Sequence, residues 1–173
     1  MDRKGAVTFK GNPLTLTGNG QKTGNKAPDF TVIGKDLKPV SLKDFGGKAK
    51  LISVTPSLDT PVCDTQARRF NEEAAKLPPE VAVLNLSMDL PFAIGRFCTS
   101  AGVERIGTYS DHRDASFGTN YGVLIKELRL LTRSIFLLDK DNVIRYMEIV
   151  PEMTDNVNFA RALEEANKLF ARR

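Results

Sequence analysis

Two apolar runs on either side of a helical pattern constrain the fold of this chain more than any other feature. Residues 49–54 and 81–87 are rich in Val, Leu and Ile and have the length of buried strands. Residues 68–77 between them have a helical pattern, and Pro78 and Pro79 end that helix before the second run. Because a strand, a helix and a second strand of this length form a parallel unit, we predict an α/β fold.

The turn between the first strand and the helix carries a cysteine. We expect Thr60 at the N-cap, with its hydroxyl accepting a backbone N–H of the first turn, and Pro61 fits the first helical position. Cys63 then lies in the first turn, where the helix dipole and unpaired N–H groups favour thiolate over thiol. Thiolate is the reactive form of cysteine.

The same cysteine also begins the apolar side of the predicted helix. One side of the helical period is formed by Cys63, Ala67, Phe70, Ala74 and Leu77. Burial opposes ionisation, so a reactive sulfur needs the dipole and a nearby cation to outweigh desolvation. The helix position therefore leaves two interpretations open, a reactive thiolate and a small apolar core residue.

Hairpins are predicted near both ends of the chain. Residues 7–10 and 14–17 flank Gly-Asn-Pro, which predicts an N-terminal β-hairpin over about residues 7–17 that covers one end of the sheet. Residues 134–139 and 143–146 predict a second antiparallel hairpin. A last helix follows, and its apolar face contains Phe159, Leu163, Ala166 and Phe170.

The segments between these elements are less regular. Residues 18–27 are predicted to form a linker loop, residues 28–34 a short strand, and residues 40–45 a connecting turn. Residues 90–98 predict a short helix that ends near the second cysteine, and residues 102–117 have no regular pattern. The element order is consistent with a thioredoxin-like α/β fold, and the pattern alone also allows a flavodoxin-like sheet.

Length and composition favour one globular domain. The 173 residues, 41% hydrophobic and 27% charged, fit a single domain over residues 1–173. The formal charge of +4 comes from scattered basic residues, with Arg172 and Arg173 at the end, so nucleic-acid binding is not expected. No apolar run has membrane-spanning length and the start is unlike a signal peptide, so we expect a cytoplasmic protein without membrane contact.

Two cysteines in a reducing compartment are more often catalytic or redox-sensing than structural, although both can also be inert. Structural zinc is not expected, because two cysteines and the one histidine, His112, are too few ligands. The chain also lacks a Gly-rich phosphate loop, so no nucleotide cofactor is expected.

Two motifs carry a resemblance to a known family. The pattern Pro56-x-x-x-Thr60-x-x-Cys63 resembles the peroxiredoxin signature, and residues 57–64 with the following Arg-Arg-Phe-Asn-Glu resemble its bacterial thiol peroxidase branch. Residues 89–98, Asp-Leu-Pro-Phe-Ala and then Arg-Phe-Cys, are similar to the segment in which that branch keeps its resolving cysteine. The similarity covers nearly the whole chain.

The resemblance implies a thioredoxin-like fold with an appended N-terminal hairpin and an atypical two-cysteine peroxidase. Cys63 would attack a hydroperoxide and become a sulfenic acid, which Cys98 would convert to an intrachain disulfide. Thr60, the Cys63 N–H and Arg133 would stabilise the transition state, while Pro56 would shield the site from water. The resemblance also implies thioredoxin as reductant and a homodimer, and the chemistry needs no metal or organic cofactor.

Other interpretations of these residues remain open from sequence. Without the resemblance, Arg133 reads as a solvated charge at a strand end, and Arg68 and Arg69 compete for its role. Cys98 can also be read as part of a static disulfide or as an inert core thiol, although a cysteine tuned to be a thiolate in the first turn of a helix is a poor place for a permanent bond. The chain as a whole is also compatible with a redox-sensing binding module, or with a thioredoxin-fold scaffold that carries incidental thiols.

Two further expectations concern the site. An apolar substrate pocket that includes Phe92 and Ile94 would favour alkyl hydroperoxides. Disulfide formation requires Cα atoms within about 7 Å, so if the helices around Cys63 and Cys98 are both formed in the reduced protein, one or both must partly unwind first.

Overall fold

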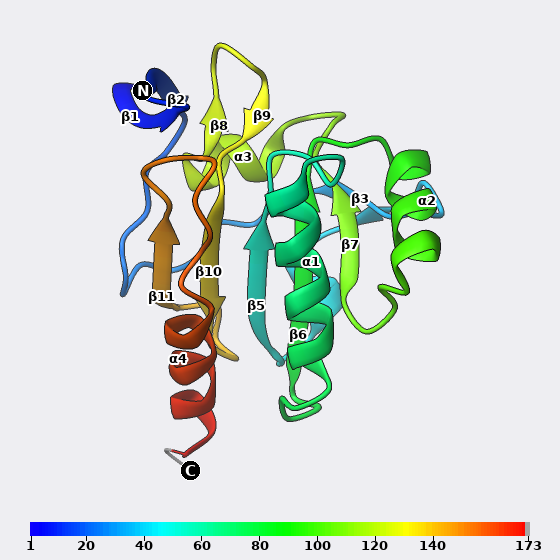
Figure 1. The fold of residues 1–173 in the computed structure, drawn as a ribbon. Coiled ribbons are helices and arrows are strands. Elements are labelled where there is room, and N and C mark those ends of the chain that lie inside the picture. Colours follow the sequence, from blue (N-terminus) through cyan, green and yellow to red (C-terminus); the bar gives the residue numbers. More distant parts are fainter. Residues whose placement is uncertain (172–173) are drawn as a thin grey trace.

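A computed structural model describes residues 1–171, and Arg172 and Arg173 lie outside the described residues. Within residues 1–171, seven strands form the central sheet: β3 (Val32–Ile33), β4 (Pro39–Val40), β5 (Ala49–Val54), β6 (Val81–Ser87), β7 (Gly107–Ser110), β10 (Ser134–Leu138) and β11 (Ile144–Ile149). Their order across the sheet is β11-β10-β5-β6-β7-β3-β4 (Figure 1).

The predicted parallel unit forms the centre of this sheet. β5 pairs with β6 in parallel, from Ala49 opposite Val81 to Val54 opposite Leu86, and α1 (Pro61–Ala74) connects them. All six residues of β5 are buried, Lys50 and Ser53 included, as expected for a central strand that is covered on both faces. The strand, helix and strand prediction is therefore confirmed.

Helix α1 ends earlier than its apolar stripe predicts. The helix ends at Ala74, and the N–H groups of Ala75, Lys76 and Leu77 donate to carbonyls three residues back. This tighter winding closes the chain before Pro78. Leu77 therefore packs against the core from outside the helix.

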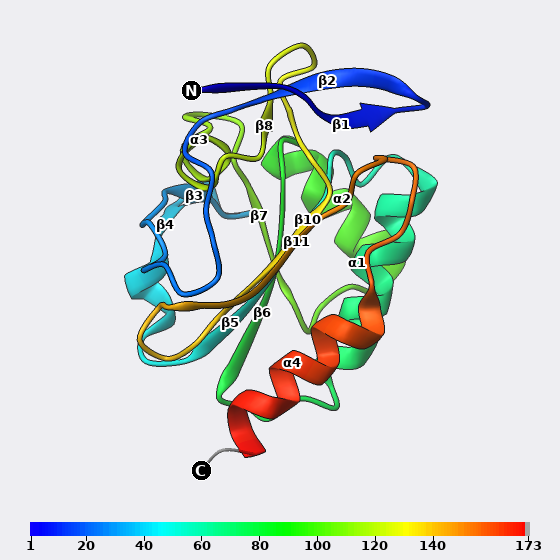
Figure 2. The same ribbon diagram turned by 90° about the vertical axis from the view of Figure 1, so that its left-hand side faces the viewer.

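Helices cover the sheet on both faces. Figure 2 shows α1, α2 (Pro91–Ala101) and α4 (Phe159–Ala171) together on one face. The short 3-10 helix η1 (Leu42–Phe45) and α3 (Ser116–Tyr121) lie on the other face. A separate hydrophobic cluster fills each side, with Phe70 and Ile135 in the one beneath α1 and Phe117 and Phe136 in the other.

The direction of β10 decides between the two α/β folds that the pattern allows. β10 is antiparallel to both β5 and β11, as the predicted hairpin requires. β6 pairs with β7 in parallel. A doubly wound flavodoxin-like sheet has parallel strands, whereas this mixed order is that of a thioredoxin-like fold. The thioredoxin-like prediction is confirmed.

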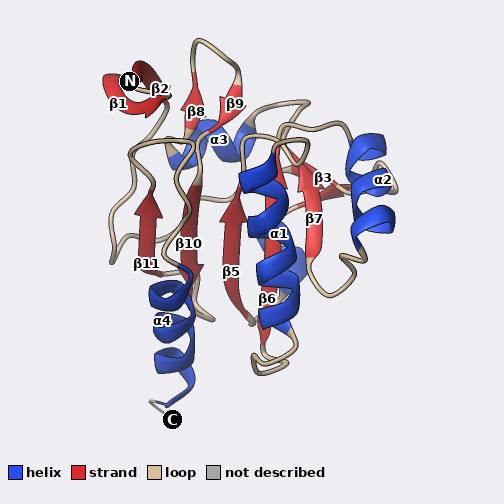
Figure 3. Ribbon diagram, viewed as in Figure 1, coloured by secondary structure: helices blue, strands red, loops and turns tan. Residues whose placement is uncertain are grey.

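The N-terminal hairpin lies across one end of the central sheet. β1 (Asp2–Phe9) and β2 (Asn12–Thr17) are antiparallel and start earlier than predicted. They form a second sheet with two-residue strands β8 (Leu124–Ile125) and β9 (Leu130–Leu131), in the order β1-β2-β8-β9. Figure 3 shows this sheet at the end from which α1 begins.

One sequence prediction for an irregular segment is wrong, because residues 102–117 contain β7 and the start of α3. The short strand predicted over residues 28–34 is present as β3, but it covers only two of those residues. Residues 40–45 do form a connection, built from the end of β4 and η1. β7 has only four residues, and its backbone is ordered by pairing with β6, which a local pattern does not reveal.

Asp111 links the end of β7 to α3 and makes stability depend on pH. Its carboxylate is 1% exposed and accepts N–H groups of Phe117 and Gly118 at 3.0 and 2.8 Å. Burial raises the pKa of Asp111 from 3.8 to about 6, because the folded protein disfavours the charged carboxylate. The folded state therefore has its full stability from this group below pH 4, where the carboxyl is protonated in both states, and loses that stability as the pH rises through 6. Two pKa units correspond to about 3 kcal/mol.

We therefore expect wild-type protein to lose more unfolding free energy than Asp111→Asn between pH 4 and pH 7. The asparagine cannot ionise, so its own cost is the same at every pH. Urea unfolding at pH 4, 5, 6 and 7 measures the difference in slope between the two proteins. Parallel curves would contradict the assignment.

No helix within the described residues is both long and apolar enough to cross a bilayer.

Candidate active site

Cys63 is the third residue of α1, and the backbone before it leaves polar groups free. Thr60 is the N-cap in extended conformation, and Pro61 occupies the first helical position as predicted. The first hydrogen bond of the helix runs from the Asp64 N–H to the Thr60 carbonyl at 2.9 Å. The N–H groups of Val62 and Cys63 precede this bond, so they have no intrahelical acceptor and point out of the helix start.

The predicted capping role of the Thr60 hydroxyl is wrong. The hydroxyl donates to the carbonyl of Ser57 at 3.0 Å, and the Thr60 N–H binds the same carbonyl at 3.2 Å. Both groups therefore close the turn before the helix, and the side chain makes no bond to the first helical turn. As a result, the first-turn N–H groups near Cys63 are not used by the cap.

Arg133 lies directly against the cysteine sulfur. Its Nη2 is 3.2 Å from Cys63 Sγ, and the arginine is only 2% exposed. The pairing of β10 with β5, with Ser134 opposite Val54, brings Arg133 to the end of β5 from which the chain enters α1. The interpretation of Arg133 as a solvated charge is therefore wrong.

The guanidinium is held by neutral acceptors. Nε and Nη2 donate to the Met153 carbonyl at 3.0 and 2.9 Å, and Nη1 donates to Gln66 Oε1 at 3.0 Å. None of the ion pairs within residues 1–171 includes Arg133. A buried cation needs a counter-charge. The Cys63 sulfur is the ionisable partner in contact with it.

A buried polar chain fixes the side of the guanidinium away from the sulfur. The Gln66 amide donates to Ser53 Oγ at 2.7 Å and to the Val54 carbonyl at 3.2 Å. Ser53 donates in turn to Asn85 Oδ1 at 3.1 Å. Gln66 was not predicted as a site residue, although a polar residue three positions after Cys63 shares its inward helix face.

The N-terminal hairpin supports the same guanidinium from the other side. The Met153 N–H donates to the Thr8 carbonyl at 2.8 Å, and the Thr8 N–H donates to the Pro151 carbonyl at 2.7 Å. β1 therefore fixes the segment whose carbonyl binds Arg133. This support was also absent from the sequence prediction, because it joins residues more than a hundred positions apart.

The other two arginines considered lie elsewhere. Arg68 pairs with Asp64 on the exposed side of α1. Arg69 lies 3.3 Å from Glu73, also at the surface. Of these three arginines, Arg133 is the one in contact with Cys63.

A pocket of about 300 Å³ opens beside this pair. Its walls are mainly apolar and come from the hairpin tip, the turn before α1, the β8–β9 loop and the segment after β11. The lining residues are Phe9, Lys10, Pro56, Ser57, Thr60, Pro61, Val62, Leu128, Leu130, Arg133, Met153 and Thr154. Pro56 and Thr60 thus lie at the pocket with Arg133. Cys63 itself is 0% exposed and lies behind this lining.

The expected contribution of Phe92 and Ile94 to this pocket is wrong. Phe92 is 72% exposed on α2, and Ile94 is buried in the cluster beneath α1 and α2. Neither residue lines the pocket. Their helix lies to one side of α1, away from the hairpin that forms the pocket wall (Figure 1).

Cys98 occupies a different environment. It lies in α2, is 3% exposed, and its thiol contacts Thr108 Oγ1 of β7 at 3.5 Å. Both cysteines are free thiols in formed helices. The structure therefore does not join the two sulfurs, and a bond between them requires the backbone of one or both helices to move.

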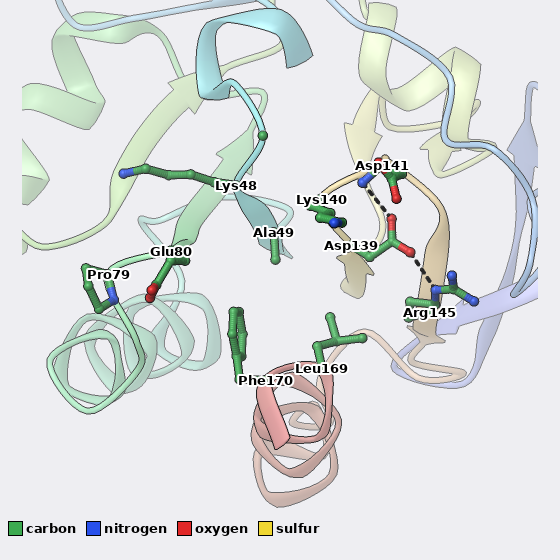
Figure 4. Close-up of a pocket in the computed structure, with 11 residues that line it drawn as sticks. Lys48, Ala49, Pro79, Glu80, Asp139, Lys140, Asp141, Arg145, Leu169 and Phe170 are labelled. Atoms are coloured by element: carbon green, nitrogen blue, oxygen red, sulfur yellow. Dashed lines mark hydrogen bonds and ion pairs between the residues drawn. The ribbon is translucent and has the colours of Figure 1, made fainter. Parts of the chain in front are cut away.

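A larger pocket lies at the opposite end of the sheet. It has a volume of about 750 Å³, and Figure 4 shows Leu169 and Phe170 of α4 facing Ala49 and Pro79 there, with a rim of charged side chains. Neither cysteine lines it. The smaller pocket is the one lined by Arg133, which contacts Cys63.

Comparisons with known proteins identify the family of the chain. The family model described as Redoxin matches residues 22–163. A thiol peroxidase of Halalkalibacterium halodurans is 55% identical, over 93% of this chain and 96% of that protein. A thiol peroxidase of Bacillus subtilis is 53% identical, over 94% of this chain and 97% of that protein.

Solved structures give the same result. A peroxiredoxin-like protein from Aquifex aeolicus has a TM-score of 0.87 and 38% identity, covering 94% of this chain and 96% of that one. The thiol peroxidase from Chromobacterium violaceum has a TM-score of 0.85 and covers 96% and 98%, and its 22% identity supports the fold alone. The chain therefore belongs to the redoxin family, among its thiol peroxidases.

Proposed function

We propose that this chain is a thiol-dependent peroxidase in which Cys63 is the peroxidatic cysteine. The observation that carries the proposal is the contact between Cys63 Sγ and a buried guanidinium that has no carboxylate partner within residues 1–171. At 3.2 Å a thiolate and a guanidinium attract by about 5 kcal/mol at an effective dielectric constant of about 20. This attraction opposes the cost of burying the two charges.

The first step is attack of the Cys63 thiolate on the terminal oxygen of a hydroperoxide. The O–O bond breaks, the sulfur becomes a sulfenic acid, and the leaving oxygen takes a proton to give water or an alcohol. Negative charge spreads over sulfur and both oxygens, so fixed donors aimed at it lower the barrier. Arg133 and the N–H groups of Val62 and Cys63 supply these donors.

Thr60 and Pro56 shape the space in which this step occurs. The hydroxyl of Thr60 is at the pocket with its proton directed to the Ser57 carbonyl, so its oxygen is free to accept a hydrogen bond from a peroxide O–H. Pro56 is buried beside it and keeps water from the sulfur. The mainly apolar walls suit an alkyl hydroperoxide as well as hydrogen peroxide.

Cys98 completes the cycle as the resolving cysteine. Its thiol attacks the Cys63 sulfenic acid, a disulfide forms, and water leaves. An external dithiol of the thioredoxin type then reduces the disulfide, and its own two thiols become a disulfide. Because the cycle needs a dithiol reductant, we place it in the cytoplasm. We also propose a homodimer, as the resemblance implies.

Mass spectrometry after one equivalent of peroxide tests the proposal. We expect a loss of two hydrogen masses and a single cross-linked peptide pair that contains both Cys63 and Cys98. The Cys98→Ser variant, treated alike, should stop at a sulfenic acid on Cys63 that a dimedone probe labels. Protein that keeps two free thiols, or that labels at Cys98 first, would contradict the assignment.

A further inference from the structure

One carboxylate ties together the two segments that carry the cysteines. Asp89 Oδ1 accepts the Ser57 hydroxyl at 2.7 Å, and Oδ2 accepts the Leu58 N–H at 2.8 Å. Oδ2 also accepts the Ser87 hydroxyl at 2.8 Å. Ser57 and Leu58 belong to the turn that leads into α1, whereas Asp89 lies two residues before the first residue of α2.

Both ends of this connection are fixed further. The Ser57 hydroxyl oxygen accepts the Asp59 N–H at 3.2 Å, so the bond to Asp89 also orders the turn before Thr60. On the other side, the Ser110 hydroxyl of β7 donates to the Asp89 carbonyl. The carboxylate therefore joins the turn before α1 to a rigid point at the ends of β6 and β7.

The charge of Asp89 is balanced by hydrogen bonds alone. No ion pair within residues 1–171 includes Asp89, and its carboxylate oxygens accept hydrogen bonds from two hydroxyls and one N–H. Hydrogen bonds to an ionised acceptor are stronger than those between neutral groups. Leu58 adds an apolar contact between the same segments, because it is 4% exposed in the cluster that contains Ile94 and Cys98.

Disulfide formation must disturb at least one of the two regions that this connection joins. Cys63 and Cys98 lie in formed helices with different partners, so the start of α1, or α2, has to leave its place before the sulfurs meet. The bonds from Asp89 to Ser57 and Leu58 join these two regions directly. Their strength therefore bears on how often the closed arrangement opens.

We propose that Asp89 is a positioning residue that holds the closed, peroxide-reactive arrangement and sets the rate at which oxidised Cys63 reaches Cys98. This inference rests on the proposed two-cysteine cycle. In the closed state the sulfenic acid can meet a second peroxide, which oxidises it to a sulfinic acid while the peroxide is reduced to water or alcohol. In the open state the Cys98 thiol attacks it, the disulfide forms and water leaves. Asp89 thus governs the competition between the two outcomes.

The Asp89→Asn variant tests the inference. An amide is uncharged and accepts through one oxygen only, so the variant replaces the charge-assisted bonds to the turn with weaker neutral ones, and we expect opening to increase about tenfold. Quenched-flow mass spectrometry should show that the disulfide forms faster by the same factor. The peroxide concentration at which half of the protein carries a sulfinic acid on Cys63 should be tenfold higher. Amide exchange in reduced protein should rise in residues 57–63. The reaction of Cys63 with the first peroxide should not become faster.

Two further variants separate this role from simple loss of stability. Ser57→Ala removes a bond across the connection and should shift the same readouts in the same direction. Ser87→Ala removes a bond to the same carboxylate but none to the turn, so its disulfide rate and exchange in residues 57–63 should match wild type. Equal disulfide rates in Asp89→Asn, Ser57→Ala and wild type would overturn the inference, as would equal acceleration in Ser87→Ala. Wild-type protein that forms no disulfide would instead contradict the proposed function.

Discussion

Replacing Cys63 with serine is expected to abolish peroxide turnover supported by thioredoxin and its reductase. Serine keeps the size and helix position of the side chain, but its hydroxyl does not ionise near neutral pH, even beside Arg133. Because removal of the nucleophile removes the reaction path, we expect a loss of at least about three orders of magnitude. Steady-state peroxide consumption measures it.

Cys98→Ser is the matched control for this experiment. It keeps Cys63, Arg133 and the pocket, so one equivalent of peroxide should still be consumed rapidly before turnover with thioredoxin stops. This separates loss of the first chemical step from loss of recycling. Peroxide turnover that survives in Cys63→Ser would rule out the proposed mechanism, and turnover at the wild-type rate in Cys98→Ser would remove Cys98 from it. Rapid sulfur oxidation without turnover in wild type would favour a redox sensor instead.

Replacing Arg133 with methionine should slow the reaction of Cys63 with peroxide by about 100-fold to 1,000-fold, the usual effect of losing a donor to developing negative charge. Methionine fills much of the same volume but removes the cation at the sulfur and leaves the Gln66 and Met153 oxygens without their donor. Arg133→Lys keeps a charge but cannot reach sulfur, amide and carbonyl at once, so we expect an intermediate rate. Rapid acid quench followed by mass spectrometry measures the oxidation of Cys63.

Arg69→Met is a suitable control, because it removes an arginine at the surface of α1 that does not contact the sulfur. Its oxidation rate should match wild type. Urea unfolding of each variant shows whether a slow rate comes from lost structure. A folded Arg133→Met protein that reacts at the wild-type rate would show that Arg133 does not stabilise the transition state.

Local sequence was sufficient for the elements that carry the cysteines. The apolar run of β5, Pro61 at the first helical position and the stripe through Cys63 and Phe70 depend on residues within a few turns of one another. The same holds for the hairpin of β10 and β11. Such features follow from backbone preferences and side-chain spacing, which a short window contains.

Elements that depend on a distant partner were predicted poorly. β7, β8 and β9 have four, two and two residues, and pairing with another strand is what orders them. The Thr60 hydroxyl follows the same rule, because its partner was decided by the turn at Ser57 instead of by the helix it precedes. Local sequence preference therefore predicted the N-cap position of Thr60 correctly, but it did not predict the acceptor of the Thr60 hydroxyl.

By itself, the sequence determined that a cysteine begins a helix after a buried parallel strand, and its motifs pointed to Arg133 only through a family resemblance. The tertiary structure decided that this arginine contacts the sulfur. The pairing of Ser134 with Val54 brings Arg133 next to Cys63, although the two are 70 positions apart in the sequence. It also decided that Gln66 and Met153 hold the guanidinium and that Asp89 joins the two cysteine-bearing segments. Contacts between distant residues depend on strand register and helix packing, which no short stretch of sequence contains.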